Sequence, residues 1–387
     1  MLCSTGCGGK EAAEPVTAPT EPVTAPTEPR SPVVPMPLGH ARRFEIHDHD
    51  GIVTVDVKRP WQGSNSNFRY VLVPHGKPIP DGVDPRTVVR IPVQRIVSMS
   101  TSFLPSLEML HALDRLVGVS RIPDISSPTV LERIKSANLA EVGPVTNVNR
   151  EAILELAPDA VFTFGVNAGD LAGFEPIIKS GIPVVLAADY MEETPLGRAE
   201  WIKFFALFVG KWNEANALYQ DIESRYTSLV ALAQKAGRRP TVMLESSYQG
   251  TWFVPGGRSY VAQFLRDAGA NYLWADDQTQ GSLRLGFEAV LERGHGADFW
   301  LNTGTWRSVA DAVAQDPRYL NFRPLAEGRT YNHNARTNSF GGNDFFETGP
   351  ARPDLVLADL IKIFHPELMK EHTLFWYRQL DPRIEKP

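Results

Sequence analysis

Two long stretches of this chain alternate short apolar strands with amphipathic helices, and this alternation limits the fold more than any other feature. In the first stretch RIVSMS (95–100), VFTF (161–164) and VVLA (184–187) have the pattern of strands. In the second stretch TVMLESS (241–247) and FWLN (299–302) have the same pattern. Strands that are separated by helices at this spacing form parallel β/α units. We therefore predict an α/β fold with two lobes.

A near-repeat relates the two lobes. EAILE at 151–155 corresponds to EAVLE at 288–292, and each segment precedes a strand, AVFTF in one case and ADFWL in the other. A single match of this kind can arise by chance, because helices in β/α units converge in sequence. Its occurrence in the same helix–strand context in both halves favours two related lobes.

The segment between the lobes carries one apolar stripe with alternating steps of four and three residues, which predicts a helix. The stripe consists of Trp201, Phe205, Phe208, Trp212, Ala215, Tyr219, Ile222, Tyr226, Leu229 and Ala233. It fits one long helix, or two helices in series with a break near Gly210. A coiled-coil seam has a similar period, but the aromatic bulk favours packing against globular lobes. We expect an N-terminal lobe at 91–195, a linking helix at 196–238, and a C-terminal lobe with closing helices at 239–387.

The first 38 residues have the composition of a tether. Residues 11–37 contain EPVTAPT twice and a proline every few positions, which favours extended polyproline II and leaves nothing to build a core. The two cysteines of the chain are Cys3 and Cys7, and Ser4-Thr5-Gly6-Cys7 is similar to the end of a bacterial lipobox. We expect Cys7 to carry a lipid after removal of a signal peptide that is longer than the printed sequence shows. The protein would then be anchored in the cell envelope, facing the periplasm or the exterior.

Between the tether and the first lobe, residues 39–90 contain three short alternating runs, FEIH, GIVTVDV and FRYVLV. Alternation of apolar and polar residues with turn residues between the runs predicts an antiparallel β extension. The sequence indicates no role for it.

Composition excludes several classes of function. A content of 43% hydrophobic and 22% charged residues is that of a globular protein with a substantial core. The net charge of −6 argues against a nucleic-acid partner. The chain has no P-loop, no G-x-S-x-G and no H-E-x-x-H, so we predict neither an enzyme nor a cofactor.

The order of these segments resembles one known family. RIVSMSTSFLPSLEMLHALDRLVGVS, VNREAILELAPDAVFTF, SGIPVVLA and FVPGGRSYVAQFLRDAGANYLW are similar to segments of the helical-backbone (class III) periplasmic substrate-binding proteins, over about residues 91–375. Those proteins serve ABC importers of ferric siderophores, cobalamin or haem. The resemblance implies a monomer that binds a metal-chelate or tetrapyrrole-like small ligand between its lobes and docks on ABC permease subunits in the membrane.

Loops that follow strands supply the candidate ligand-binding residues. Aromatic faces can bury the flat surface of a chelate, and arginines can pair with its oxygens. Trp252 and Arg258 stand out because they flank a glycine pair that allows close approach of the backbone. The full set is Ser100, Thr101, Ser102, Arg121, Tyr190, Tyr248, Trp252, Arg258, Trp306 and Phe340.

The resemblance also implies an acidic residue at the tip of each lobe that pairs with arginines of the permease. In the first lobe the expected place offers Asp170 and Glu175. The near-repeat points to about Ser308 in the second lobe, where the nearest acid is Asp311. Ordinary surface carboxylates remain an equally good interpretation of these three residues.

Three alternatives stay open from sequence. A binder of free metal ions would need clustered ligands, but the nine histidines are scattered, and we predict no metal site. A chelatase-like enzyme would also use two β/α lobes around a tetrapyrrole, although such enzymes act in the cytoplasm. A surface adhesion module on a stalk would bind no small molecule.

Overall fold

The computed structural model describes residues 34–137 and 139–382. The chain divides into two units, Met1–Pro32 and Val33–Pro387. Cys7 and most of the predicted tether lie outside the described residues, and so does the predicted lipidation. Among the residues that are described, no helix is both long and apolar enough to cross a lipid bilayer.

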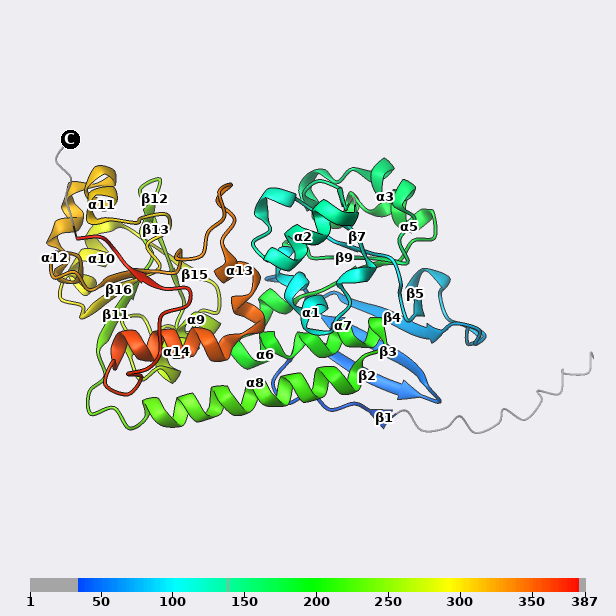
Figure 1. Ribbon diagram of the computed structural model, residues 1–387, viewed down its shortest axis with the longest axis horizontal. Helices are drawn as coiled ribbons and strands as arrows, with labels where there is room; N and C mark the ends of the chain where they lie inside the picture. The colour runs from blue at the N-terminus through cyan, green and yellow to red at the C-terminus, as the bar shows by residue number, and fades with distance from the viewer. Residues whose placement is uncertain (1–33, 138, 383–387) are drawn as a thin grey trace, which may run out of the picture. The chain divides into compact units, whose positions relative to one another are not determined.

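The first lobe is built on a sheet of five parallel strands in the order β10-β9-β6-β7-β8 (Figure 1). The strands are β6 (Ile96–Ser98), β7 (Leu116–Val119), β8 (Ala140–Glu141), β9 (Ala160–Thr163) and β10 (Val184–Leu186). Its helices are α1 (Leu104–Met109), α2 (Pro128–Ala137), α3 (Arg150–Leu156), α4 (Ala168–Ala172) and α5 (Glu175–Lys179).

Both faces of this sheet are buried. Successive side chains of a strand point to opposite faces, so Ile96 joins one hydrophobic cluster and Val97 another. Helices α3 and α5 cover the Val97 face through Ile153 and Ile177. This double burial explains the continuous apolar runs in the sequence, which are typical of parallel sheets.

The second lobe has a five-stranded sheet in the order β14-β11-β16-β17-β18, parallel except for β18. Its strands are β11 (Thr241–Leu244), β14 (Asn271–Tyr272), β16 (Phe299–Leu301), β17 (Thr330–Asn332) and β18 (Arg378–Gln379). A smaller antiparallel sheet contains β12 (Ser247–Tyr248), β13 (Thr251–Pro255) and β15 (Ser282–Leu285). The helices are α9 (Tyr260–Asp267), α10 (Phe287–Gly294), α11 (Val309–Gln315), α12 (Arg323–Ala326), α13 (Asp344–Glu347) and α14 (Pro353–Phe364). The two β/α lobes confirm the predicted fold class.

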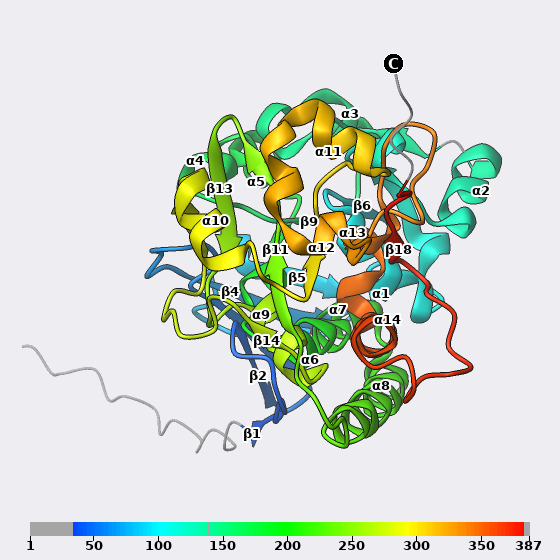
Figure 2. The same cartoon turned by 90° about the vertical axis from the view of Figure 1, so that its left-hand side faces the viewer.

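The connection between the lobes consists of α6 (Pro195–Ala199), α7 (Trp201–Val209) and α8 (Trp212–Ala233). The break falls at Gly210, whose φ of 71° lies in the left-handed region that glycine adopts without strain. After this break the chain turns back, and α8 runs beneath α7 toward the second lobe (Figures 1 and 2). The predicted break near Gly210 is confirmed, and the reversal of the chain there is a feature that the apolar stripe does not indicate.

Helix α8 is the element that belongs to both lobes. Tyr219 and Ile222 are part of the first lobe's hydrophobic cluster, whereas Tyr226 and Ala233 are part of the second lobe's. Its 22 residues correspond to about 33 Å of helix. A single stiff helix that enters both cores resists large changes in the angle between the lobes.

The N-terminal extension forms a sheet of its own in the order β1-β2-β3-β4-β5, antiparallel except for the β4–β5 pair. The strands are β1 (Val34–Pro35), β2 (Phe44–His49), β3 (Ile52–Lys58), β4 (Asn67–Pro74) and β5 (Val88–Ile91). Its inner face shares the first lobe's core, where the rings of Phe44 and Trp201 lie 4.6 Å apart. The extension is thus a continuous part of the first lobe's packing.

Candidate functional site

The carboxyl ends of the parallel strands in both lobes border one cleft. Tyr190 follows β10 in the first lobe, while Glu245, Asn302 and His333 directly follow β11, β16 and β17 in the second. Loops at these ends are free of the sheet's own hydrogen bonding, and in open α/β sheets ligands bind there. The cleft contains three hollows, which we call the outer, inner and opposite hollows.

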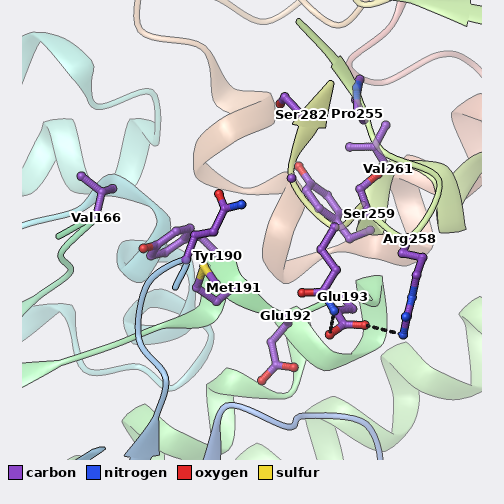
Figure 3. Close-up of a pocket in the computed structure, with 14 residues that line it drawn as sticks. Val166, Tyr190, Met191, Glu192, Glu193, Pro255, Arg258, Ser259, Val261 and Ser282 are labelled. Carbon is purple, nitrogen blue, oxygen red and sulfur yellow. Dashed lines mark hydrogen bonds and ion pairs between the residues drawn. The ribbon is translucent and has the colours of Figure 1, made fainter. Parts of the chain in front are cut away.

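The outer hollow has a volume of about 400 Å³ and is lined by both lobes (Figure 3). The first lobe contributes Val166, Tyr190 and Met191, and the second contributes Arg258 and Tyr260. The Tyr190 hydroxyl lies 2.7 Å from the carbonyl oxygen of Gly165 and 3.1 Å from that of Pro60, so it can donate to either. Both acceptors lie on the same side of the cleft as Tyr190. The hydrogen bond therefore fixes the Tyr190 ring in place as part of the wall of the hollow.

The N-terminal extension also reaches this hollow. Gln62, in the loop between β3 and β4, lines it together with Gly281 of the second lobe. A methyl group on Gly281 would lie 3.3 Å from the Gln62 amide, so the two residues are in close contact. The N-terminal extension, for which the sequence indicates no role, therefore forms part of the cleft wall.

Glu193 bridges the lobes beside the outer hollow. Its carboxylate accepts a hydrogen bond of 2.5 Å from Gln280 Nε2 and lies 4.0 Å from the Arg258 guanidinium (Figure 3). The neighbouring Glu192 also lines the hollow, but its carboxylate is engaged: it accepts hydrogen bonds from the backbone N–H groups of Arg42 and Arg43 at 2.8–3.0 Å. Among the described residues the Arg258 guanidinium has only the long contact to Glu193, so its donors are available to a ligand.

A second bridge closes the other side of the cleft. The opposite hollow, about 740 Å³, lies between Thr101 and Asp124 of the first lobe and the 334–346 segment of the second. Asn338 Nδ2 donates to the carbonyl oxygens of Pro123 and Ile125, both at 2.8 Å. Burial raises the pKa of the Glu347 carboxyl to about 7, although it accepts hydrogen bonds from the backbone of Ser126 and Ser127.

The inner hollow, about 110 Å³, lies in the second lobe between the other two. It shares Tyr260 and Val261 with the outer hollow, and Gly304 and Phe346 with the opposite hollow. The inner hollow therefore adjoins both of the larger ones. Burial raises the pKa of the Glu245 carboxyl in this hollow to about 8.

His333 forms another wall of the inner hollow. Its ring stacks on Phe345 with 4.3 Å between centroids, and burial lowers the pKa of His333 to about 4, so it is neutral at pH 7. Among the described residues, no group of three or more His, Cys, Asp or Glu side chains is placed to hold a metal ion.

With this geometry in place, comparison with known proteins decides the family. A family model described as periplasmic binding protein matches residues 96–337. The chain belongs to the periplasmic binding protein family. The matched segment begins at β6 and includes most of both lobes, while the extension precedes it.

Relatives and solved structures agree with this assignment. Two uncharacterized lipoproteins of Methanocaldococcus jannaschii are 26% identical to this binding protein, over 297 residues (73% of this chain, 68% of the relative) and 312 residues (78% and 76%). A periplasmic haem-binding protein of Pseudomonas aeruginosa has a TM-score of 0.56 at 21% identity and covers 75% of this chain and 99% of its own. The molybdate-binding protein MolA of Haemophilus influenzae has a TM-score of 0.57 at 18% identity, with 75% and 93% covered.

These solved structures establish the fold, which is that of the helical-backbone, class III binding proteins. Proteins of this family are extracytoplasmic solute-binding subunits of ABC transporters. This binding protein is accordingly a solute-binding transport component.

Some of the predicted ligand-binding residues line the three hollows, and others do not. Thr101 lines the opposite hollow, and Tyr190 and Arg258 line the outer one. The other candidates on the surface do not line the three hollows. Ser100 caps the turn that contains Ser102, Arg121 pairs with Asp124 at 3.5 Å, Tyr248 is 67% exposed on the β12–β13 hairpin, and Phe340 is 78% exposed at a turn.

The structure contradicts the predicted ligand-binding roles of Trp252 and Trp306. Trp252 is fully buried, with its ring stacked at 5.7 Å on Trp300 and its Nε1 donating to the carbonyl oxygen of Leu244. Trp306 is buried beside Tyr319 and donates from Nε1 to Gln315 at 2.8 Å. Neither indole has a free face, so the prediction that they stack on a ligand is wrong.

Glu245 is not among the candidate ligand residues predicted from the sequence, although in the structure its position at the end of a strand indicates this role. The sequence predicts one strand over TVMLESS (241–247), which includes Glu245, whereas β11 ends at Leu244 and makes Glu245 the first residue after it, where ligand contacts are usual. Tyr260 and Phe346 were missed for another reason, because only the tertiary fold shows which side of their helices faces the cleft.

The predicted docking acids occupy matching places in the two lobes. Asp170 closes a capping box with Asn167 at the start of α4, and Asp311 closes one with Ser308 at the start of α11. Ser308 is therefore the counterpart of Asn167, which corrects the predicted alignment of Ser308 with an acid. Glu175 is exposed at the start of α5 and lies 3.6 Å from Lys179.

Proposed function

We propose that this binding protein captures an iron–siderophore or a corrinoid- or haem-like ligand in its cleft and delivers it to an ABC importer. The observation that carries this proposal is the pair of hollows of about 400 and 740 Å³, each lined by both lobes and each sharing lining residues with the inner hollow. These volumes fall in the range of about 300–1,000 Å³ that is usual for ligand sites. We infer binding without turnover, by a monomer that is lipid-anchored at Cys7 outside the cytoplasm.

The charges of the residues that line the cleft restrict the class of ligand further. The acidic residues that line the three hollows are Asp124, Glu192, Glu193 and Glu245, and the arginines are Arg258 and Arg307. Recognition of a polyanion would call for a surplus of arginines, because each carboxylate of the ligand needs a cationic partner. This lining favours a neutral or cationic chelate, such as a ferric hydroxamate or a corrinoid, over an anionic one.

We expect Tyr190→Ala and Arg258→Ala each to weaken ligand binding by about 1–3 kcal/mol, the usual range for an aromatic or charged anchor. The ligand is first found by titrating the protein with a ferric hydroxamate, cyanocobalamin and haemin, and affinities are then measured by calorimetry. Tyr248→Ala, which removes an exposed ring outside the three hollows, is the matched control and should bind as the wild type does.

Unchanged affinity in both variants, with the fold intact, would place the ligand outside the outer hollow. A ligand found to be chemically converted by the protein would contradict binding without turnover.

The lipid anchor has a test of its own. Full-length protein that is expressed with its complete leader should incorporate radioactive palmitate, and Cys7→Ser should abolish the labelling because it removes the acceptor thiol. Cys3→Ser is the control and should leave labelling unchanged. Equal labelling of wild type and Cys7→Ser would show that Cys7 is not the lipid site.

A further inference from the structure

Glu245 has an unusual position at the end of β11. Its backbone N–H donates to Leu301 at 3.0 Å, and its carbonyl accepts a 2.6 Å hydrogen bond from the Trp300 indole. Its φ is 66°, in the left-handed region that residues other than glycine rarely adopt. Asn302, at the end of the neighbouring strand β16, has a φ of 60°. Strained backbone at adjacent strand ends is typical of binding sites, and here the core holds it in place.

The Glu245 carboxyl has no hydrogen-bond or ion-pair partner within residues 34–137 and 139–382. Burial raises the pKa of this carboxyl to about 8, and none of the described residues that line the hollow is a lysine or an arginine. The titratable groups that line the hollow with it are Tyr260, His333 and Tyr377. The Tyr377 hydroxyl donates to Asn302 instead, at 3.0 Å.

Arg198, a cation that contacts one of the wall residues, is already engaged. The Arg198 guanidinium lies 4.7 Å from the centre of the Tyr260 ring and 3.5 Å from Asp189, and it does not line the hollow. The neutral His333 adds no positive charge. The inner hollow therefore lacks a counter-ion of its own among the described residues.

Five Phe and Tyr rings contribute to the remaining wall, together with aliphatic side chains. Tyr260, Phe264, Phe345, Phe346 and Tyr377 surround the space in front of the carboxyl. A carboxylate among aromatic rings attracts a cation doubly, through its charge and through the negative faces of the rings. A volume of about 110 Å³ holds only a few non-hydrogen atoms, which suits the end of an arm and excludes a whole chelate.

We propose that Glu245 and these rings form an inner subsite for a cationic nitrogen, such as a primary ammonium, carried on an arm of the ligand. This inference rests on the proposed capture of a chelate in the cleft, and it specifies the ligand class: a neutral chelate with one ammonium arm. The body of the chelate lies in the outer or opposite hollow, and the arm enters between Tyr260 and Phe346.

The test uses two ferric chelates that differ only at the arm. Ferrioxamine B is a tris-hydroxamate chelate that ends in a primary ammonium, and its N-acetyl derivative lacks that charge. We expect wild-type protein to bind ferrioxamine B at least about tenfold more tightly, the loss typical of one buried charged contact. Glu245→Gln should bind the two chelates equally. Glu193→Gln, which removes a carboxylate elsewhere in the cleft, should keep the preference.

A second measurement needs no variant. Because the carboxyl is largely protonated at pH 7 in the free protein, binding an ammonium should release close to one proton, and binding the acetylated chelate should release none. Calorimetry in two buffers of different ionisation enthalpy measures this difference.

The outcomes separate the two proposals. Equal affinity of wild type for both chelates, or an unchanged preference in Glu245→Gln, overturns the subsite and leaves capture of a chelate standing. Failure of the wild type to bind either chelate, cyanocobalamin or haemin overturns the proposed function and the subsite together.

Discussion

Trp252→Ala is expected to lower the free energy of unfolding by about 3–5 kcal/mol, the range for removing a large aromatic side chain from a packed core. The indole is fully buried and packs against Trp300, Tyr319 and Phe322, with ring centroids 5.7–5.8 Å apart. The alanine variant would leave a cavity lined by these rings, and it would also remove the hydrogen bond to Leu244. Urea denaturation of the purified protein measures the effect.

The neighbouring residue provides the control. Phe253 is on the same strand, β13, but its side chain faces outward and is 38% exposed. Phe253→Ala should therefore lower the free energy of unfolding clearly less than Trp252→Ala does, because part of the Phe253 ring stays in contact with water in the folded protein. If Trp252→Ala unfolded as readily as Phe253→Ala but bound ligand far more weakly, the core position of Trp252 would be contradicted.

The contrast between these two residues shows what the sequence could and could not provide. Burial alternates along β13, so Trp252 and Val254 share its inner face, but Trp252, Phe253 and Val254 are all apolar and the sequence alone does not show which ring faces the core. The glycine pair that follows suggested a ligand site. Gly256 and Gly257 are explained by packing, since a methyl group on either would lie within 2.2–2.9 Å of backbone atoms of the 274–281 loop.

The two lobes could be predicted because strand and helix periods are local properties of the sequence. The course of the linking helices could not, because the same apolar stripe results whether the chain continues past Gly210 or turns back there. The two arrangements differ only in long-range contacts, such as that of α8 with α14. The same limit applies to Gln62, whose place in the cleft depends on the contact between the extension and the second lobe.

The position of the cleft could be predicted from the sequence, but the charge of its lining could not. Strand ends identify Thr101 and Tyr190 without any tertiary information, since every parallel strand exposes its carboxyl end at the same edge. Which acids remain unpaired there depends on partners far away in sequence. Glu192 binds the backbone of residues 42 and 43, whereas Glu245 has no such partner among the described residues.

Replacing both Asp170 and Asp311 by lysine is expected to reduce transport into cells by about tenfold or more while ligand affinity stays unchanged. The proposal behind this prediction is that the two acids pair with arginines of the permease. Their equal positions, each as the acid of a capping box at the start of the helix that follows β9 or β16, suit a docking surface with two similar halves. Lysine would place like charges face to face, which costs several kcal/mol at an interface.

Capping offers a second explanation for the same residues, and the variants separate the two. Asp170 accepts hydrogen bonds from Val166 N and Asn167 N, and losing such a cap costs about 1 kcal/mol of stability. The double asparagine variant keeps an acceptor oxygen but removes the charge, so it should also transport slowly if docking depends on charge. Transport at the wild-type rate by the asparagine variant would leave capping as the sole role.

The near-repeat supplies a matched control for the change in charge. Glu155 and Glu292 occupy corresponding places on α3 and α10, and both are exposed. Their double replacement by lysine changes the net charge by the same amount as the docking variant, and it should leave uptake of radiolabelled ligand within about twofold, because isolated surface charges contribute little. Uptake that falls equally in both double variants would show a dependence on net charge rather than on the two capped acids. A fall confined to Asp170 and Asp311 would assign the permease contact to the matching helix starts of the two lobes.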